Sequence, residues 1–183
     1  MNKIIAVVGM CGSGKTVATD IFQKYGFKKV YFGEVTFDEL KRLNLPVNET
    51  NERMVREKFR ASGDKAIYAK LNLPKIEALH KTDNVVVESM YSWSEYKLLK
   101  EHFGDVFEVL AIVTNAGLRR ERLHNRPIRP MTSEESKSRD YAEIENIEKA
   151  GPIGIADYYI TNNGSNEEYA QKVENFIKEY IKK

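Results

Sequence analysis

Hydrophobic positions along the chain alternate between two kinds of segment. Short apolar runs rich in β-forming residues are predicted strands at 3–8, 29–32, 84–87, 106–113 and 158–160. The longer stretches between them repeat apolar residues every three or four positions, which is typical of helices. This alternation favours an α/β fold with a largely parallel, five-stranded sheet covered by helices on both faces. We expect one domain, residues 1–183.

Several predicted helices carry clear end signals. The helix at 15–25 stops at Gly26, and capping-box patterns at 132–135 and 165–168 begin two later helices. The last helix places aromatic and aliphatic side chains on one face, which we expect to close the sheet. These are Tyr169, Val173, Phe176, Ile177 and Tyr180.

Composition narrows the class of protein. Hydrophobic residues make up 42% of the chain, and no apolar run approaches the roughly 20 residues of a membrane span. The 29 Lys and Arg nearly balance the 27 Asp and Glu, which gives no general reason to expect nucleic acid or membrane as a partner. The first nine residues are too short for a signal peptide, and the lone Cys11 cannot form an internal disulfide. Cytoplasm is therefore the expected location.

Residues 9–16 read Gly-Met-Cys-Gly-Ser-Gly-Lys-Thr and match the phosphate-binding pattern G-x-x-x-x-G-K-[ST]. They follow a predicted strand and precede a helix, so amide N–H groups and the helix dipole can face an anion. Lys15 is expected to reach the β- and γ-phosphates of ATP, and Thr16 to bind Mg²⁺. We interpret Cys11 as a small loop residue rather than a redox group. The expected nucleotide contacts are Gly9, Cys11, Gly12, Ser13, Gly14, Lys15, Thr16 and Val17.

Two carboxylates follow predicted strands, at the sheet edge where ligands bind in open α/β folds. Glu88 ends the third strand, where it can hold Mg²⁺ through water or simply face solvent. Glu34 follows the second strand, where it can orient the acceptor hydroxyl, anchor metal-bound water, or only interact with a helix dipole. For each of these carboxylates, the functional and the purely structural roles stay open from the residues alone.

Five arginines lie within 119–129, directly after the fourth predicted strand. Arg122 and Arg126 share one helix face with Arg119, and Arg139 lies on the helix that returns from this segment. Guanidinium groups suit the charge that develops on a transferred phosphoryl group, so we place Arg122, Arg126 and Arg139 in the catalytic site. Residues 126–132 form a predicted short lid. The alternatives are a solvated helix face or an RNA-binding patch.

A helical insertion at 37–80, interrupted at Pro46, Gly63 and Pro74, separates the second and third strands. Its Arg53, Arg56 and Arg60 fall on one helix face, which is either solvated or holds an acceptor phosphate. Arg56 and Arg60, with Tyr91 beyond the third strand, are the candidate acceptor-binding residues.

The chain resembles the nucleoside-monophosphate-kinase group of P-loop kinases, and within it adenylate-kinase-related and dephospho-coenzyme-A-kinase-like proteins. The segments that carry this similarity are 9–16, 33–35, 119–126, 139–140 and 154–162. The resemblance implies a P-loop NTPase three-layer sandwich with a helical acceptor-site insertion and a short lid. It further implies that Arg122 lies against the adenine, that Arg126 and Arg139 approach the phosphates, that Glu34 lies near acceptor and metal, and that Asn162 and Asn163 lie near the base.

Three features depart from these relatives. Thr36 and Phe37 stand where an arginine is common, residues 88–91 read Glu-Ser-Met-Tyr in place of Asp-Gly-x-Arg, and the lid is poorer in acids or arginines.

We expect transfer of the γ-phosphate of MgATP to a small nucleotide or nucleotide-like acceptor. One alternative is a dephospho-coenzyme A kinase with Glu34 as base. An alternative of another class is an ATP-dependent switch that hydrolyses ATP slowly and signals to a protein partner.

Overall fold

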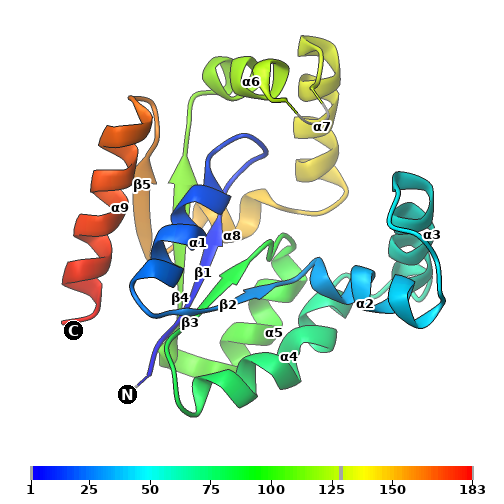
Figure 1. The fold of residues 1–183 in the computed structure, drawn as a ribbon, viewed down its shortest axis with the longest axis horizontal. Coiled ribbons are helices and arrows are strands. Elements are labelled where there is room, and N and C mark those ends of the chain that lie inside the picture. The colour runs from blue at the N-terminus through cyan, green and yellow to red at the C-terminus, as the bar shows by residue number, and fades with distance from the viewer. Residues whose placement is uncertain (1, 128–129, 183) are drawn as a thin grey trace.

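The computed structural model describes residues 2–127 and 130–182, and a five-stranded parallel sheet runs through its centre. The strand order is β2-β3-β1-β4-β5 (Figure 1). Every predicted strand is found close to its expected ends. The strands are β1 Ile4–Val8, β2 Lys28–Tyr31, β3 Val85–Glu88, β4 Phe107–Val113 and β5 Tyr158–Thr161.

Helices cover both faces of the sheet, which makes the three-layer α/β sandwich of P-loop kinases. Helices α1 (Lys15–Lys24) and α9 (Asn166–Tyr180) lie on one face. Helices α4 (Ile67–His80), α5 (Trp93–Phe103) and α8 (Ala150–Gly154) lie on the other. A short 3₁₀ helix, Gly104–Val106, leads from α5 into β4.

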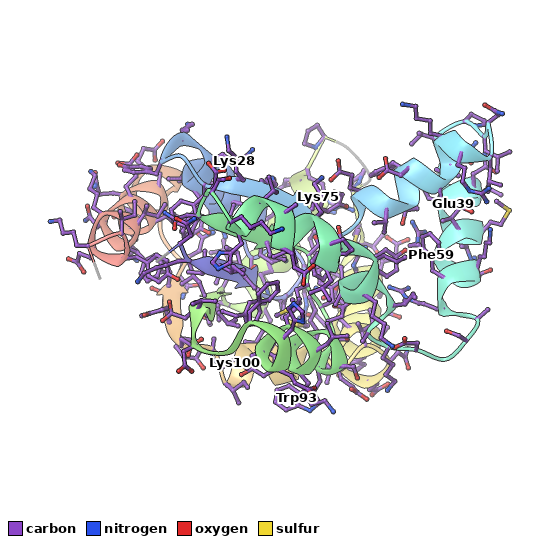
Figure 2. The ribbon with its side chains drawn as sticks, turned by 90° about the horizontal axis from the view of Figure 1, so that it is seen from below. Lys28, Glu39, Phe59, Lys75, Trp93 and Lys100 are labelled. Carbon is purple, nitrogen blue, oxygen red and sulfur yellow. The ribbon has the colours of Figure 1, made fainter. Side chains whose placement is uncertain are left out.

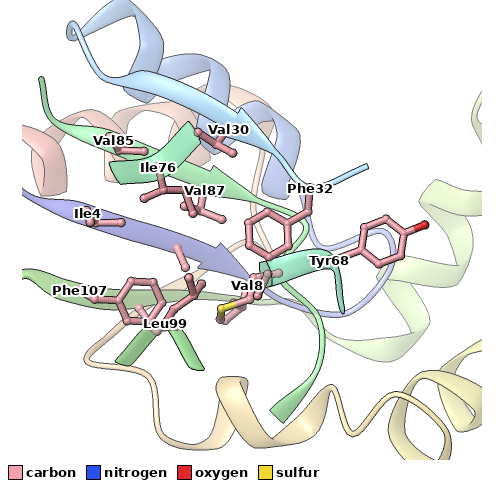
Figure 3. Close-up of a cluster of buried hydrophobic side chains, with 14 of the residues drawn as sticks. Ile4, Val8, Val30, Phe32, Tyr68, Ile76, Val85, Val87, Leu99 and Phe107 are labelled. Carbon is pink, nitrogen blue, oxygen red and sulfur yellow. The ribbon is translucent and has the colours of Figure 1, made fainter. Parts of the chain in front are cut away.

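The core divides at the sheet because successive side chains of a strand point to opposite faces. Ile4 and Val8 of β1 pack with Leu99 and Phe107 under α4 and α5 (Figure 3). Ile5 and Val7 pack instead against α1 and α9. Every residue of β1 is buried, as expected for a central parallel strand.

The predicted helix ends are confirmed. Helix α1 ends at Lys24, and Gly26 follows with a φ of 90°. Both predicted capping boxes form, at Thr132 before α7 (Ser133–Glu145) and at Ser165 before α9. The expected face of α9 packs on the sheet, with four of its residues buried and Phe176 partly so.

The predicted insertion separates into two parts. Helices α2 (Glu34–Arg42) and α3 (Glu49–Arg60) extend away from the sheet, as the positions of Glu39 and Phe59 show in Figure 2. Helix α4 belongs to the layer that covers the sheet (Figure 1). The predicted interruption at Pro74 is wrong, because α4 continues through it. Burial of Ala69 and Ile76 against the sheet outweighs the hydrogen bond that proline removes.

Helices α6 (Ala116–Asn125) and α7, which flank the predicted lid, lie beyond the carboxyl ends of the strands (Figure 1). Of the lid residues 126–132, 128 and 129 lie outside the described residues. Within the described part of the chain, no helix combines the length and the apolar character needed to cross a membrane.

Candidate functional site

The phosphate-binding loop runs from the end of β1 to the start of α1, and the rest of the fold holds it tightly. The Asn162 side-chain amide donates to the Ser13 carbonyl at 2.8 Å, and the Tyr169 hydroxyl donates to the Gly14 carbonyl at 2.9 Å. Gly14 has a φ of 99°, and a Cβ there would lie 2.5 Å from Nδ2 of Asn162. Only glycine therefore fits where the loop enters α1.

Gly14→Ala is expected to destabilise the protein more than Gly26→Ala does, and to weaken nucleotide binding as well. Gly26 has a similar φ of 90°, but a Cβ added there would meet nothing within 4 Å. Its alanine variant therefore carries only the cost of left-handed backbone, about 1–2 kcal/mol. Urea unfolding and calorimetric titration with ATP compare the two variants. Equal losses of stability with intact binding would contradict the role of Gly14.

Lys15 lines the cavity over the loop, whereas Ser13 is buried and does not line it. Lys15 Nζ donates to the Met10 carbonyl at 3.0 Å. Burial, followed by the charge of Lys149, lowers the pKa of Lys15 to about 7. Ser13 Oγ is buried and has no hydrogen-bond partner among the described residues. An anion with several oxygens, such as a phosphate, would satisfy the Lys15 ammonium and the amides of the first turn of α1.

Glu88 emerges beside this loop because the parallel register pairs it with Val7 of β1. Its Oε1 accepts from the Thr16 hydroxyl at 2.6 Å, and its Oε2 lies 2.5 Å from Lys29 Nζ. Glu88 is buried, so the alternative of a solvent-facing carboxylate is wrong. Residues 2–127 and 130–182 hold no cluster of three metal-ligating His, Cys, Asp or Glu. Mg²⁺ needs few protein ligands when phosphates supply others, so Thr16 and Glu88 fit it.

The arginines of α6 divide between structural and site positions. Arg119 is buried, pairs with both Asp140 oxygens at 2.7 and 2.9 Å, and donates to the Cys11 carbonyl at 3.0 Å. It therefore fastens α7 to the loop. Arg122 donates to the Asn162 side chain and backbone, and it lines a cavity over the loop together with Arg126.

Two cavities meet at the carboxyl edge of the sheet. The first, of about 670 Å³, contains the loop residues Cys11, Gly12, Gly14, Lys15, Thr16 and Val17. The second, of about 370 Å³, lies between the sheet and helices α2 and α3 and contains Arg56 and Arg60. The residues that line both are Tyr31, Ser89, Tyr91, Arg139 and Glu143. A donor at the loop and an acceptor in the second cavity would be neighbours.

The second cavity combines aromatic and charged walls. Tyr31 and Phe37 stack at its edge with ring centroids 6.5 Å apart. The guanidinium carbon of Arg60 lies 5.4 Å from the centroid of the Tyr68 ring. Burial raises the pKa of Glu95 to about 7, although its carboxylate accepts from the Ser92 and Tyr91 amides. This lining suits a flat ring with an attached anion.

Some candidates lie away from these cavities. Glu34 is half-exposed, forms an ion pair with Lys75, and lines neither cavity. Arg53 is exposed and pairs with Glu57 at 2.8 Å, and unlike Arg56 and Arg60 it does not line the second cavity. Gly9 and Asn162 support the loop from behind rather than lining the cavity. Asn163 accepts from the Asn115 amide at 2.9 Å.

The structure adds residues that the sequence reasoning missed. Glu143 of α7 and Lys149 before α8 are buried beside the loop, and Lys29 contacts Glu88. Glu95 had a visible signal, because Ser92-x-x-Glu95 is a capping box. Glu143 follows Arg139 by four residues, which indicates a helical ion pair but no function. Lys149 carried no local signal.

Comparisons with known proteins agree with this fold. Residues 5–147 match a family described as an AAA domain. A UPF0200 protein of Thermococcus kodakarensis is 33% identical over 184 residues, which cover 98% of this chain and 99% of that protein.

Solved structures share the fold at low identity. A dephospho-CoA kinase from Campylobacter jejuni matches with a TM-score of 0.61 and 19% identity, over 100% of this chain and 98% of that one. A shikimate kinase from Bacteroides thetaiotaomicron matches with a TM-score of 0.59 and 14% identity, over 96% and 98%. Fold, phosphate loop and sequence similarity thus agree, and the chain belongs to the AAA-domain family of P-loop proteins and, within the relatives compared, to the UPF0200 proteins.

Proposed function

We propose that this protein is a P-loop phosphotransferase that moves the γ-phosphate of MgATP to a nucleotide or nucleotide-like small molecule. The observation that carries the proposal is the junction of the two cavities, which share Tyr31, Ser89, Tyr91, Arg139 and Glu143. In-line transfer requires donor and acceptor oxygens to approach within about 3–3.5 Å. A protein that only hydrolyses ATP needs the first cavity alone.

On the donor side, the chain supplies a complete set of phosphate-binding groups. The loop amides and Lys15 would bind the phosphates, and Arg122, Arg126 and Arg139 line the same cavity. Thr16 and Glu88 are the residues that would hold Mg²⁺, which contributes charge neutralisation across the phosphate oxygens when bound.

On the acceptor side, Arg56 and Arg60 provide positive charge for a phosphate, while Tyr31 and Phe37 provide a surface for a ring. Positioning and charge stabilisation can account for most of the catalysis, because phosphoryl transfer needs little covalent chemistry from the protein. The dephospho-coenzyme A alternative assigned the base to Glu34, which pairs with Lys75 outside both cavities. The geometry therefore favours a nucleoside monophosphate over dephospho-coenzyme A as the acceptor.

The test is ADP formation from MgATP in the presence of a panel of nucleoside monophosphates, dephospho-coenzyme A and no acceptor. One acceptor is expected to raise turnover far above background, and Lys15→Ala or omission of Mg²⁺ is expected to abolish it. Arg60→Ala should raise the KM for that acceptor about tenfold or more, since it removes a charge-assisted contact. Arg53→Ala, on the same helix but outside the cavity, is the matched control.

A different result would favour the alternative function. If ATP binds but no acceptor accelerates its loss, the assignment as a nucleotide kinase fails and the ATP-dependent switch becomes the better interpretation. Accelerated turnover with equal losses in Arg60→Ala and Arg53→Ala would leave the transferase but reject the second cavity as the acceptor site.

A further inference from the structure

A buried carboxylate touches the phosphate-binding loop. Glu143 Oε2 accepts from the Cys11 backbone amide at 3.3 Å and lies 2.8 Å from Lys149 Nζ. Its Oε1 accepts from Arg139 Nε at 3.3 Å. Glu143 and Lys149 are only 6% and 3% exposed, so the contact between them forms away from bulk water, while the Arg139 side chain is half-exposed.

The three groups around Glu143 are those that proteins use to bind phosphate. A loop amide, a lysine ammonium and an arginine guanidinium together form a site for a polyvalent oxyanion. A carboxylate is the side chain that most closely copies the charge and oxygen geometry of such an anion. Glu143 thus makes, within the chain itself, the contacts that a phosphoryl group would make.

The charges of this cluster belong to the same site as Lys15. After burial, Lys149 is the largest influence that lowers the pKa of Lys15. Burial alone would raise the pKa of Glu143, but Lys149 and Arg139 outweigh it and hold the pKa below its usual value. Glu143 therefore stays ionised and forms ion pairs with Lys149 and Arg139.

The position of Glu143 indicates which phosphate would replace it. Glu143 and Arg139 line both cavities, whereas Lys15 and Thr16 line only the one over the loop. The phosphate at the junction must be the one that faces the acceptor, which is the terminal phosphate of a nucleoside triphosphate. A purely structural ion pair would have no need of the loop amide, nor of a place between two cavities.

We propose that Glu143 occupies the terminal-phosphate site and that a nucleoside triphosphate displaces it, after which Lys149 and Arg139 bind the terminal phosphoryl oxygens. This inference rests on the nucleotide site of the proposed function but not on phosphoryl transfer. A diphosphate has no γ-phosphate to compete with Glu143, so the carboxylate lowers affinity for triphosphate and leaves affinity for diphosphate unchanged.

The test is the ratio of two dissociation constants, for a non-hydrolysable ATP analogue and for ADP, both with Mg²⁺ and measured by calorimetry. Glu143→Gln keeps the shape of the side chain and removes its charge. It is therefore expected to tighten binding of the analogue several-fold and to leave the affinity for ADP unchanged. Glu145→Gln, an exposed change on the same helix, is the matched control and should leave both constants unchanged.

A second variant tests the cation while avoiding an unpaired buried charge. Glu143→Gln combined with Lys149→Met removes both charges. This double variant is expected to lack the increase in affinity for the ATP analogue that Glu143→Gln alone produces. Weaker analogue binding in Glu143→Gln, or an unchanged ratio of the two dissociation constants, would overturn the proposal. Glu143 would then serve only to position Lys149 and Arg139. Normal analogue binding without turnover would reject only the proposed function, while a wild type that binds neither nucleotide would overturn both.

Discussion

Asp140→Ala is expected to lower the free energy of unfolding by about 3–5 kcal/mol, because it leaves a buried arginine without its partner. Arg119 is 6% exposed, and both of its terminal nitrogens donate to Asp140. Without Asp140, the Cys11 carbonyl alone among these contacts accepts from the guanidinium. Urea unfolding followed by circular dichroism measures the loss.

Two controls separate the ion pair from general damage to α7. Glu145→Ala changes an exposed acid on the same helix and should alter stability by less than about 0.5 kcal/mol. Asp140→Leu combined with Arg119→Met removes both charges and should restore much of the stability. If Asp140→Ala costs less than about 1 kcal/mol, the pair does not fasten α7 to the loop.

Raising the pH from 7 to 9 is expected to weaken nucleotide binding by up to about tenfold per pH unit for each proton taken up. The pKa of Lys15 is about 7 in the folded protein, owing first to burial and then to Lys149. A bound phosphate favours the charged amine and raises that pKa, so binding takes up a proton above pH 7. Calorimetry in buffers of different ionisation enthalpy measures the uptake, which Lys15→Met should remove.

The same shift predicts how stability without nucleotide depends on pH. The pKa of Lys15 falls from its ordinary value of 10.5 to about 7 on folding, so the unfolded chain binds more protons between these values. Stability from this group therefore rises with pH in that window, and the cost of its buried charge is largest below pH 7. Lys15→Met should flatten this rise, whereas Lys24→Met, at an exposed position of α1, should retain it. A fall in stability across the window that Lys15→Met removes would contradict the lowered pKa.

The local parts of the fold could be predicted because their signals are local. The apolar runs, the glycine-rich loop and the capping residues act on neighbouring positions, and the strands and capped helices form where those signals stand. The prediction of a break at Pro74 was wrong because a local sequence signal does not include the burial of the helix. In the structure, α4 lies against the sheet, and its packing outweighs the proline.

The candidate site was predictable only on the side of the loop. Lys15 and Thr16 were assigned by the motif, and Glu88 by its place at a strand end. Arg119 and Arg122 shared one predicted helix face, yet one pairs with buried Asp140 and the other reaches Asn162. Spacing gives the face of a helix, whereas the partner of each side chain depends on which element packs beside it.

By itself, the sequence determined the α/β alternation, the five strands and the loop that can bind phosphate, because each depends on residues close together in the chain. Only the tertiary structure decided which carboxylate, besides Glu88, stands by that loop. Glu34 follows a strand but turns to Lys75, while Glu143, more than a hundred residues further on, reaches the Cys11 amide. The physical reason is that charge–charge contacts and burial act through space. The packing of α7 against α6 brings residues that are far apart in the chain to the loop.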